Sequence, residues 1–291
     1  MHEIEAKSLL TRWNGMNLYR GCTHGCVYCD SRSRCYRFDH SFEDVAVKRN
    51  APELLEKVLR TRKKPFIVST GSMSDPYQPC EENLRLTRRC MELIDRYGFG
   101  ASVITKSDRV LEDLNLFESV HHKAKSVLQM TLTVSDDALS RILEPKVCAT
   151  SRRYEVLKEF QKRGIPCVVW MTPFLPFLTD TEENFTRLME YCLDAGVKGI
   201  VCFGVGMTLR DGNREYYYQA LDRYFPGLRD RYRETYGNAY HIVSVNHERL
   251  MAKFHSLCER YGILSDPDAC FNWIREMPDG NAQISLFGNT K

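Results

Sequence analysis

The sequence predicts an α/β fold in which helices cover a parallel sheet. Six short apolar segments recur along the first two thirds of the chain, and segments with helical spacing of apolar residues separate most of them. Continuous apolar strands that alternate with helices are typical of parallel sheets. Six such units form either a doubly wound sheet or an incomplete barrel, and the spacing does not separate the two. In both architectures the chemistry belongs at the carboxyl ends of the strands.

The elements follow one another in a regular order. One strand precedes Cys22, and further apolar strands are predicted at 66–70, 101–105, 126–133, 167–171 and 199–204. Helices are predicted between them at 51–62, 83–97, 109–117 and 151–163. The clearest helix comes next, because Asp180 and Glu183 have capping-box spacing and Gly196 supplies the stop.

The alternation ends at about Asn213. Helical patterns follow at 214–224 and 247–261. We therefore predict three parts, namely an α/β unit, a helical cap and a C-terminal tail, over residues 1–212, 213–264 and 265–291.

The composition is that of a globular protein, with 43% hydrophobic and 27% charged residues and a net charge of +3 over 291 residues. No apolar run approaches the roughly 20 residues that span a bilayer. The first residues lack the basic and apolar regions of a signal peptide. We expect a cytoplasmic protein with no membrane partner. Short Lys and Arg clusters occur, but each by itself indicates a solvated helix surface.

Three of the twelve cysteines fall within eight residues, in the segment 17–29, which we call the cysteine loop. Their spacing is C-x3-C-x2-C, at Cys22, Cys26 and Cys29. Gly21 and Gly25 stand where bends with positive φ are needed. The other nine cysteines are scattered without paired spacings, which suits a reducing compartment and gives no sign of a second cluster.

Thiolates are soft ligands that select iron–sulfur clusters, zinc or copper(I). In one interpretation the three cysteines bind a 4Fe-4S cluster whose fourth iron stays open to a chelating ligand. In the other, His24 completes a closed Cys3His zinc site, which would be structural. Zinc ligands usually come as two separated pairs, whereas these residues crowd into one loop. The arrangement therefore favours iron–sulfur.

The cysteine loop resembles the signature of the radical S-adenosylmethionine superfamily, since an aromatic residue, Tyr28, stands just before the last cysteine. The longer string N-x-Y-R-G-C-x-H-G-C-x-Y-C is similar to the subgroup related to spore photoproduct lyase, and the resemblance runs from about Met16 to Gly262. It implies a partial (β/α)6 TIM-type barrel that is open on one side. It also implies a 4Fe-4S cluster, S-adenosyl-L-methionine, an external electron donor and a 5′-deoxyadenosyl radical.

The resemblance further implies anchors for S-adenosyl-L-methionine at strand ends. Gly71 and Ser72 follow the second strand, where the superfamily holds the methionine amino group. Lys106 would pair with the methionine carboxylate. The remaining expected cofactor-binding residues are Tyr28, Thr131, Thr133 and Arg153. Each has a plainer alternative, since Asp-Pro favours a turn after Ser72, strand threonines pack well without a ligand, and Arg153 can be surface charge.

One position departs from the subgroup. The cysteine that donates hydrogen to the product radical in the photoproduct lyases aligns with Ser72, whose hydroxyl does not replace a thiol easily. Tyr77, Cys80 and Cys202 are the candidate donors that remain. Repair of a thymine dimer is therefore in doubt, whereas radical initiation is unaffected.

The tail carries a second motif. Gln283, Leu286 and Phe287 belong to Q-I-S-L-F, which resembles the pentapeptide by which bacterial repair proteins dock on the DNA sliding clamp. A packed terminal strand is the alternative. Our leading hypothesis is a radical enzyme that acts on nucleic acid, in lesion repair or base modification. The alternatives are radical modification of a peptide, RNA or small molecule, and a zinc-stabilised nucleic-acid-binding module without catalysis.

Overall fold

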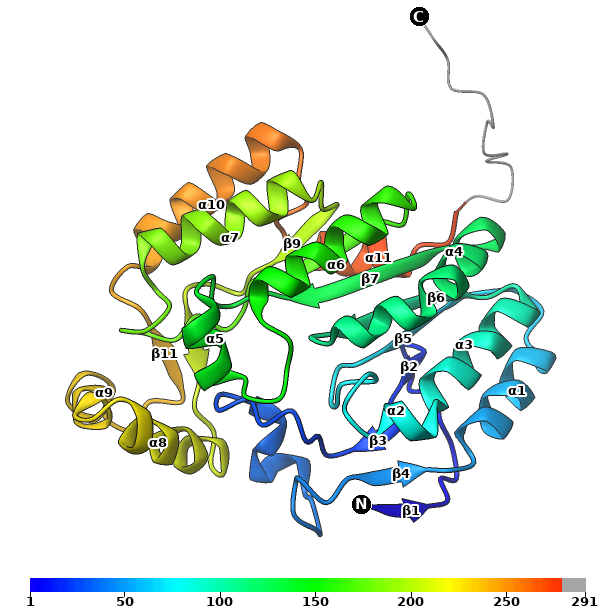
Figure 1. Cartoon of the computed structure of the whole chain (residues 1–291), viewed down its shortest axis with the longest axis horizontal. Coiled ribbons are helices and arrows are strands. Elements are labelled where there is room, and N and C mark those ends of the chain that lie inside the picture. The colour runs from blue at the N-terminus through cyan, green and yellow to red at the C-terminus, as the bar shows by residue number, and fades with distance from the viewer. Residues whose placement is uncertain (279–291) are drawn as a thin grey trace, which may run out of the picture.

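A six-stranded parallel sheet forms the centre of the part of the chain that the computed structural model describes, residues 1–278 (Figure 1). Each strand lies beside the next strand of the sheet along the chain, and the two edge strands are not paired with each other. This order is that of an unclosed barrel, and it confirms the partial (β/α)6 TIM-type architecture over a doubly wound sheet, whose strand order would reverse. In spatial order the strands are β2 (Gly15–Met16), β5 (Ile67–Thr70), β6 (Gly100–Thr105), β7 (Ser126–Thr131), β8 (Cys167–Trp170) and β9 (Gly199–Val201).

Helices cover the outer face of this sheet, as the apolar stripes predict. The main core lies between the two layers, where alternate strand residues such as Leu128 and Met130 are completely buried. The outer helices are α1 (Ala51–Thr61), α3 (Leu86–Tyr97), α4 (Leu114–Lys123), α6 (Thr150–Lys162), α7 (Glu182–Asp194) and α10 (His247–Tyr261). Two short helices, α2 (Glu81–Leu84) and α5 (Asp137–Leu143), and the 3-10 helix η3 (Asp108–Asp113) lie in the connections.

Three predicted boundaries were wrong. Arg85 adopts the left-handed conformation, with φ of 47°, and divides the helix expected at 83–97 into α2 and α3. The helix expected at 109–117 begins as η3 and continues further, to Lys123, as α4. Thr181 caps α7 in place of Asp180, because its side chain accepts from the Asn184 amide whereas Asp180 accepts from Ser244.

A second, small sheet supports the start of the chain. Its order is β1–β4–β3, from β1 (His2–Ile4), β3 (Tyr19–Arg20) and β4 (Ala46–Lys48). The strand that leads to the cysteines, Tyr19–Arg20, therefore pairs with β4, and the first barrel strand is β2, slightly earlier in the chain. Two 3-10 helices, η1 (Asp30–Arg32) and η2 (Arg34–Tyr36), follow the cysteines.

The C-terminal third is more varied than a helical cap. The helices α8 (Asn213–Tyr224) and α9 (Leu228–Tyr236) connect two antiparallel strands, β10 (Gly206–Thr208) and β11 (His241–Val243), and pack beside them. Helix α10 lies beside α7 in the outer layer (Figure 1). The tail expected from 265 includes a further helix, α11 (Pro267–Arg275). Cys270 and Ile274 of α11 pack on the inner side of the sheet, on the opposite face from α6 (Figure 1).

Residues 279–291 lie outside the described part of the chain, and the motif of Gln283, Leu286 and Phe287 falls there. Within residues 1–278 no helix has the length and apolar character needed to cross a membrane.

Candidate active site

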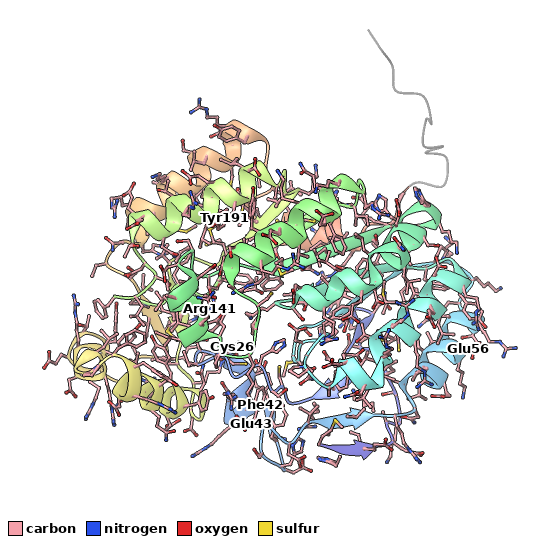
Figure 2. The ribbon with its side chains drawn as sticks, viewed as in Figure 1. Cys26, Phe42, Glu43, Glu56, Arg141 and Tyr191 are labelled. Atoms are coloured by element: carbon pink, nitrogen blue, oxygen red, sulfur yellow. The ribbon has the colours of Figure 1, made fainter. Side chains whose placement is uncertain are left out.

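The cysteine loop brings its three thiols to one cavity. Cys22 and Cys26 are buried, Cys29 is half-buried, and all three are free and line a cavity of about 630 Å³. Gly21 and Gly25 have φ of 97° and 74°, so the two bends that the sequence predicts are present. Figure 2 places Cys26 near the middle of the molecule, between Phe42 and α5.

One side of the loop is fixed by the segment after β5. The Gln78 side chain is fully buried and bonds to the backbone of the loop as a neighbouring strand would. Its Oε1 accepts from the Thr23 amide at 3.1 Å, and its Nε2 donates to the Gly21 carbonyl at 3.4 Å. His24 Nδ1 lies 3.5 Å from a carboxylate oxygen of Asp75. The loop is therefore held by side chains that satisfy its own backbone groups.

The connection between α5 and α6 holds the other side. The Val27 amide donates to the Leu143 carbonyl at 2.9 Å, and the Lys146 amide donates to the His24 carbonyl at 3.1 Å. Between these two bonds, the Tyr28 hydroxyl donates to Glu144. Tyr28 is buried, so its phenol ties the loop to a carboxylate in the protein interior.

Glu144 is neutralised by Arg153, and both side chains are completely buried. Arg153 also donates to the Thr131 carbonyl at 2.8 Å and to the hydroxyls of Ser140 and Thr150 at 3.1 Å. Burial alone would raise the pKa of Glu144, but the charges of Arg153 and Lys106 outweigh burial and hold that pKa below its usual value. Arg153, expected to bind the cofactor, thus does not line the cavity and binds Glu144.

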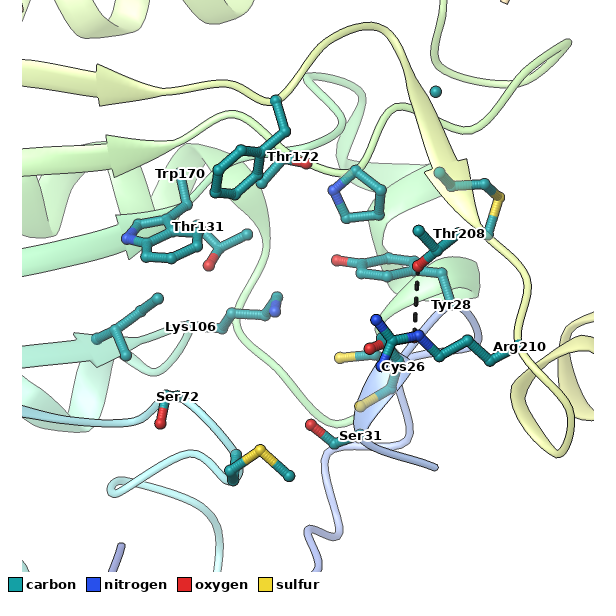
Figure 3. Close-up of a pocket in the computed structure, with 18 of the residues that line it drawn as sticks. Cys26, Tyr28, Ser31, Ser72, Lys106, Thr131, Trp170, Thr172, Thr208 and Arg210 are labelled. Carbon is teal, nitrogen blue, oxygen red and sulfur yellow. Dashed lines mark hydrogen bonds and ion pairs between the residues drawn. The ribbon is translucent and has the colours of Figure 1, made fainter. Parts of the chain in front are cut away.

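The strand ends form the facing wall of the cavity. Gly71, Ser72, Lys106 and Thr131 line it, and Figure 3 shows the last three across from Cys26 and Tyr28. The Lys106 Nζ lies 5.7 Å from the centre of the Tyr28 ring. The structure therefore brings the cysteines and four of the predicted cofactor anchors, together with Tyr28, to one space.

Asp75 organises this wall. Its carboxylate accepts from the Thr105 hydroxyl at 2.7 Å and from the Lys106 amide at 2.8 Å, which joins the ends of β5 and β6. Gly71, at φ of 102°, lies so close to β6 that a Cβ there would be 2.1 Å from the Ile104 carbonyl oxygen. No larger residue fits at position 71 without moving the strand end.

The remaining lining of the cavity carries rings and polar groups. Trp170 from β8 and Phe203 after β9 lie together, with their ring centres 6.1 Å apart, whereas Arg210 after β10 lies across from Trp170, beside Cys26 (Figure 3). His241 from β11 also lines the cavity. Trp170 Nε1 donates to Gln129 at 2.7 Å, and Gln129 donates to Ser102 at 2.7 Å, so three inner-face side chains of neighbouring strands are bonded in a row.

Four predicted residues lie outside the cavity lining besides Arg153. Thr133 is buried beneath it and its hydroxyl is 3.3 Å from the Tyr28 hydroxyl. Tyr77 is buried and donates to Asp113 at 2.8 Å. Cys80 immediately precedes α2, and Cys202 lies 3.9 Å from the Met251 sulfur. The three candidate hydrogen donors are therefore not grouped at the cavity.

The donor set fits an iron–sulfur cluster better than zinc. Among residues 1–278, no group of three or more His, Cys, Asp or Glu side chains is placed to hold a single metal ion, and His24 faces Asp75. A cubane cluster takes each cysteine on a different iron, so its ligands need not converge on one ion. Burial raises the pKa of Cys22 to about 12, and a cationic partner is needed for its thiolate to form.

An unclosed parallel barrel with three cysteines beside the carboxyl ends of its strands defines a class of cofactor-dependent enzymes. The chain belongs to the radical SAM superfamily, whose family model matches residues 16–189. It is a radical SAM enzyme, and the cofactors of this family are a 4Fe-4S cluster and S-adenosyl-L-methionine. The zinc-stabilised module without catalysis is thereby excluded.

The chain is also similar to proteins of uncharacterized function. An uncharacterized protein of Mycobacterium tuberculosis is 28% identical over 280 residues, which are 91% of this chain and 82% of the relative. An uncharacterized protein of Methanocaldococcus jannaschii is 33% identical over 171 residues, 57% of this chain and 62% of that protein.

Among solved structures, a mutant of spore photoproduct lyase with bound AdoMet and dinucleoside spore photoproduct has a TM-score of 0.61 at 14% identity, over 86% of this chain and 74% of the other. A second mutant of that lyase has a TM-score of 0.64 at 12% identity, over 91% of this chain and 80% of the other. At these identities the likeness is one of fold.

Proposed function

We propose that this radical SAM enzyme acts on a nucleic-acid base, in repair of a lesion or in base modification. The observation that carries the proposal is the part of the cavity lining outside the cysteines and the strand-end anchors. Trp170 and Phe203 offer ring faces there, and Arg210 and His241 offer hydrogen-bonding groups, which is the combination that recognises a base taken out of its stack. The likeness in fold to a lyase crystallised with a dinucleoside photoproduct supports the same substrate class.

The division of labour between the walls follows from their chemistry. Cys22, Cys26 and Cys29 hold the cluster. When bound, the cluster supplies the electron that splits a carbon–sulfur bond of S-adenosyl-L-methionine and yields a 5′-deoxyadenosyl radical. The Lys106 ammonium would hold the methionine carboxylate, and the small residues Gly71 and Ser72 would let the amino acid part approach the strand ends closely.

The chain's own residues also direct where the radical reacts. The hydrogen bonds from Trp170 to Gln129 and from Gln129 to Ser102 fix the position of the indole ring, which forms one side of the cavity. A base that enters past Phe203 is therefore held against the strand ends. Such placement is the main task of a protein in cofactor-driven chemistry.

The cavity lining does not include the residues that we considered as donors of hydrogen to the product radical. Within residues 1–278 the cysteines that line the cavity are those of the loop, and Tyr77, Cys80 and Cys202 are separated from it. Our proposal is therefore a base-directed radical reaction in general, and thymine-dimer repair is one member of that class.

The test is anaerobic reconstitution followed by reduction with dithionite. We expect about four irons and four sulfides per chain, and 5′-deoxyadenosine whose amount rises when oligonucleotides, intact or irradiated, are added. Cys26→Ala serves as the inactive control. Formation that peptides stimulate and oligonucleotides do not would refute the nucleic-acid proposal, whereas the radical chemistry would stand.

We further propose that the segment with Gln283, Leu286 and Phe287 docks on a DNA sliding clamp. Its sequence pattern supports the idea, since two apolar side chains next to a glutamine suit an apolar pocket with a polar rim. Binding of the full chain to a purified clamp is compared with that of the Leu286→Ala, Phe287→Ala double variant. Equal affinity of the two proteins would remove this argument for a DNA partner.

A further inference from the structure

Two large aromatic side chains stand exposed on either side of the gap in the barrel. Trp13 precedes the edge strand β2 by two residues, and Phe203 follows the other edge strand, β9, by two residues. Each is 62% exposed, although rings of this size are usually covered. The two rings therefore mark the open side of the barrel.

Helix α11 connects these two rings. The Arg275 guanidinium lies 5.3 Å from the centre of the Trp13 ring and 5.6 Å from that of Phe271. Phe271 in turn lies 6.4 Å from Phe203, centre to centre, and Phe203 lines the active-site cavity. Arg12 places a second guanidinium 5.4 Å from the Trp13 ring. We call this continuous surface, Arg12, Trp13, Phe203, Phe271 and Arg275, the open-side strip.

We propose that the open-side strip binds a single-stranded segment of nucleic acid whose bases stack on Trp13 and Phe203 and whose next base enters the cavity. The proposal rests on the proposed function and adds to it the strandedness of the substrate and the path by which it approaches. Proteins bind single strands with aromatic rings that stack on bases and with cationic groups that follow the backbone.

The arrangement favours this occupant over a duplex. A paired duplex keeps the faces of its bases stacked on one another, and an exposed indole gains nothing from it. Guanidinium groups of the strip lie over ring faces, where they can also meet phosphates at the edge of a stacked base. The strip ends in the cavity at Phe203, and a strand laid along it leads directly to the cysteine loop.

The test measures binding apart from turnover. The reconstituted full-length protein is titrated into fluorescently labelled single-stranded and duplex oligonucleotides, and anisotropy gives Kd. Wild type is compared with Trp13→Ala and Phe203→Ala. The matched control is Tyr224→Ala, because Tyr224 is an exposed ring on α8, outside the strip, with the Arg223 guanidinium 5.1 Å from its centre.

We expect single strands to bind more tightly than duplexes. Trp13→Ala and Phe203→Ala should each raise Kd by about 5- to 150-fold, the range for loss of one base-stacking ring. Tyr224→Ala should leave Kd unchanged. Arg275→Gln should lower the slope of log K against log salt by about 0.7, the value for one phosphate contact on a single strand.

The outcomes separate this inference from the proposed function. Tight binding that neither ring variant weakens would refute the role of the open-side strip in binding, whereas the proposal of a nucleic-acid substrate would stand. No binding of any oligonucleotide by the wild type would overturn both. A dimer in solution that Trp13→Ala converts to a monomer would show that a second copy of the chain covers the strip, and would also overturn the inference.

Discussion

The cysteine loop and the open-side strip border the same cavity but are held in contrasting ways. Buried polar side chains, above all Gln78, Asp75 and Glu144, bond to the loop or to the walls beside it. The strip consists of two exposed rings, the half-buried ring of Phe271 and two guanidiniums, in contact with one another. We therefore expect the chemistry shared across the superfamily to occur on a rigid support, whereas the surface that we propose for substrate binding can differ at little cost to the fold.

The largest effect is expected where the cofactor meets the loop. Cys26→Ala removes one of the three proposed iron ligands from a buried position. We expect iron content after reconstitution to fall to near zero and 5′-deoxyadenosine to disappear. Cys35→Ala is the control, because Cys35 is an exposed cysteine just beyond the loop. This variant should retain its iron. Equal iron in both variants would mean that the cluster is held elsewhere.

The second effect tests the buried support of the loop. Arg153→Met leaves Glu144 without its cation in a completely buried site. Removing one partner of a buried ion pair costs about 3–5 kcal/mol of unfolding free energy, which chemical denaturation of the apoprotein measures.

The double variant Glu144→Gln, Arg153→Met is the control for that experiment. It removes both charges, and we expect it to recover part of the lost stability. If Arg153→Met is as stable as wild type, the ion pair does not support the loop.

A smaller effect is expected from Tyr28→Phe. The ring remains and the bond from its hydroxyl to Glu144 is lost, which costs about 1–3 kcal/mol when a buried acceptor is left with fewer partners. The loop should therefore lose iron faster to a chelator, followed by the decay of cluster absorbance. Tyr36→Phe, a half-exposed tyrosine at the edge of the cavity, should leave the rate of iron loss unchanged.

The smallest effect on the fold is expected in the strip. Phe203→Ala changes an exposed side chain, so the free energy of unfolding should stay within about 0.5 kcal/mol of wild type. Iron content should also be unchanged, whereas oligonucleotide binding should be weaker in the Phe203→Ala variant. A large loss of stability would show that the strip is part of the core, and the contrast between the two regions would fail.

Much of the barrel could be predicted because its signals are local. Strands such as 101–105 are continuous apolar runs, and the helix 247–261 agrees in both bounds with the structure. The missed helix α11 has a capping Asp266 and a proline at its start, signals that were present but lay in a segment read as a tail. The sequence around Arg85 does not indicate a left-handed backbone conformation, because tertiary packing imposes that conformation.

The site divides in the same way. The cysteines and strand-end anchors follow from spacing and from their place after strands, and the structure collects them at one cavity. Gln78 and Glu144 were missed because their partners are backbone groups or a phenol more than fifty residues away. Arg153 was noticed, but only its burial reveals that its partner within residues 1–278 is Glu144. Long-range polar pairs of this kind leave no periodic trace in a sequence.

The two bonds that Leu143 and Lys146 make to the cysteine loop also bear on how the protein is assembled. A ribosome delivers residues 22–29 well before residues 143–146, so the loop exists for a time without one of its two supports. Cluster insertion should therefore come after the segment with Leu143 and Lys146 has packed against the loop. A fragment that ends before residue 143 should carry all three cysteines and still fail to keep its iron.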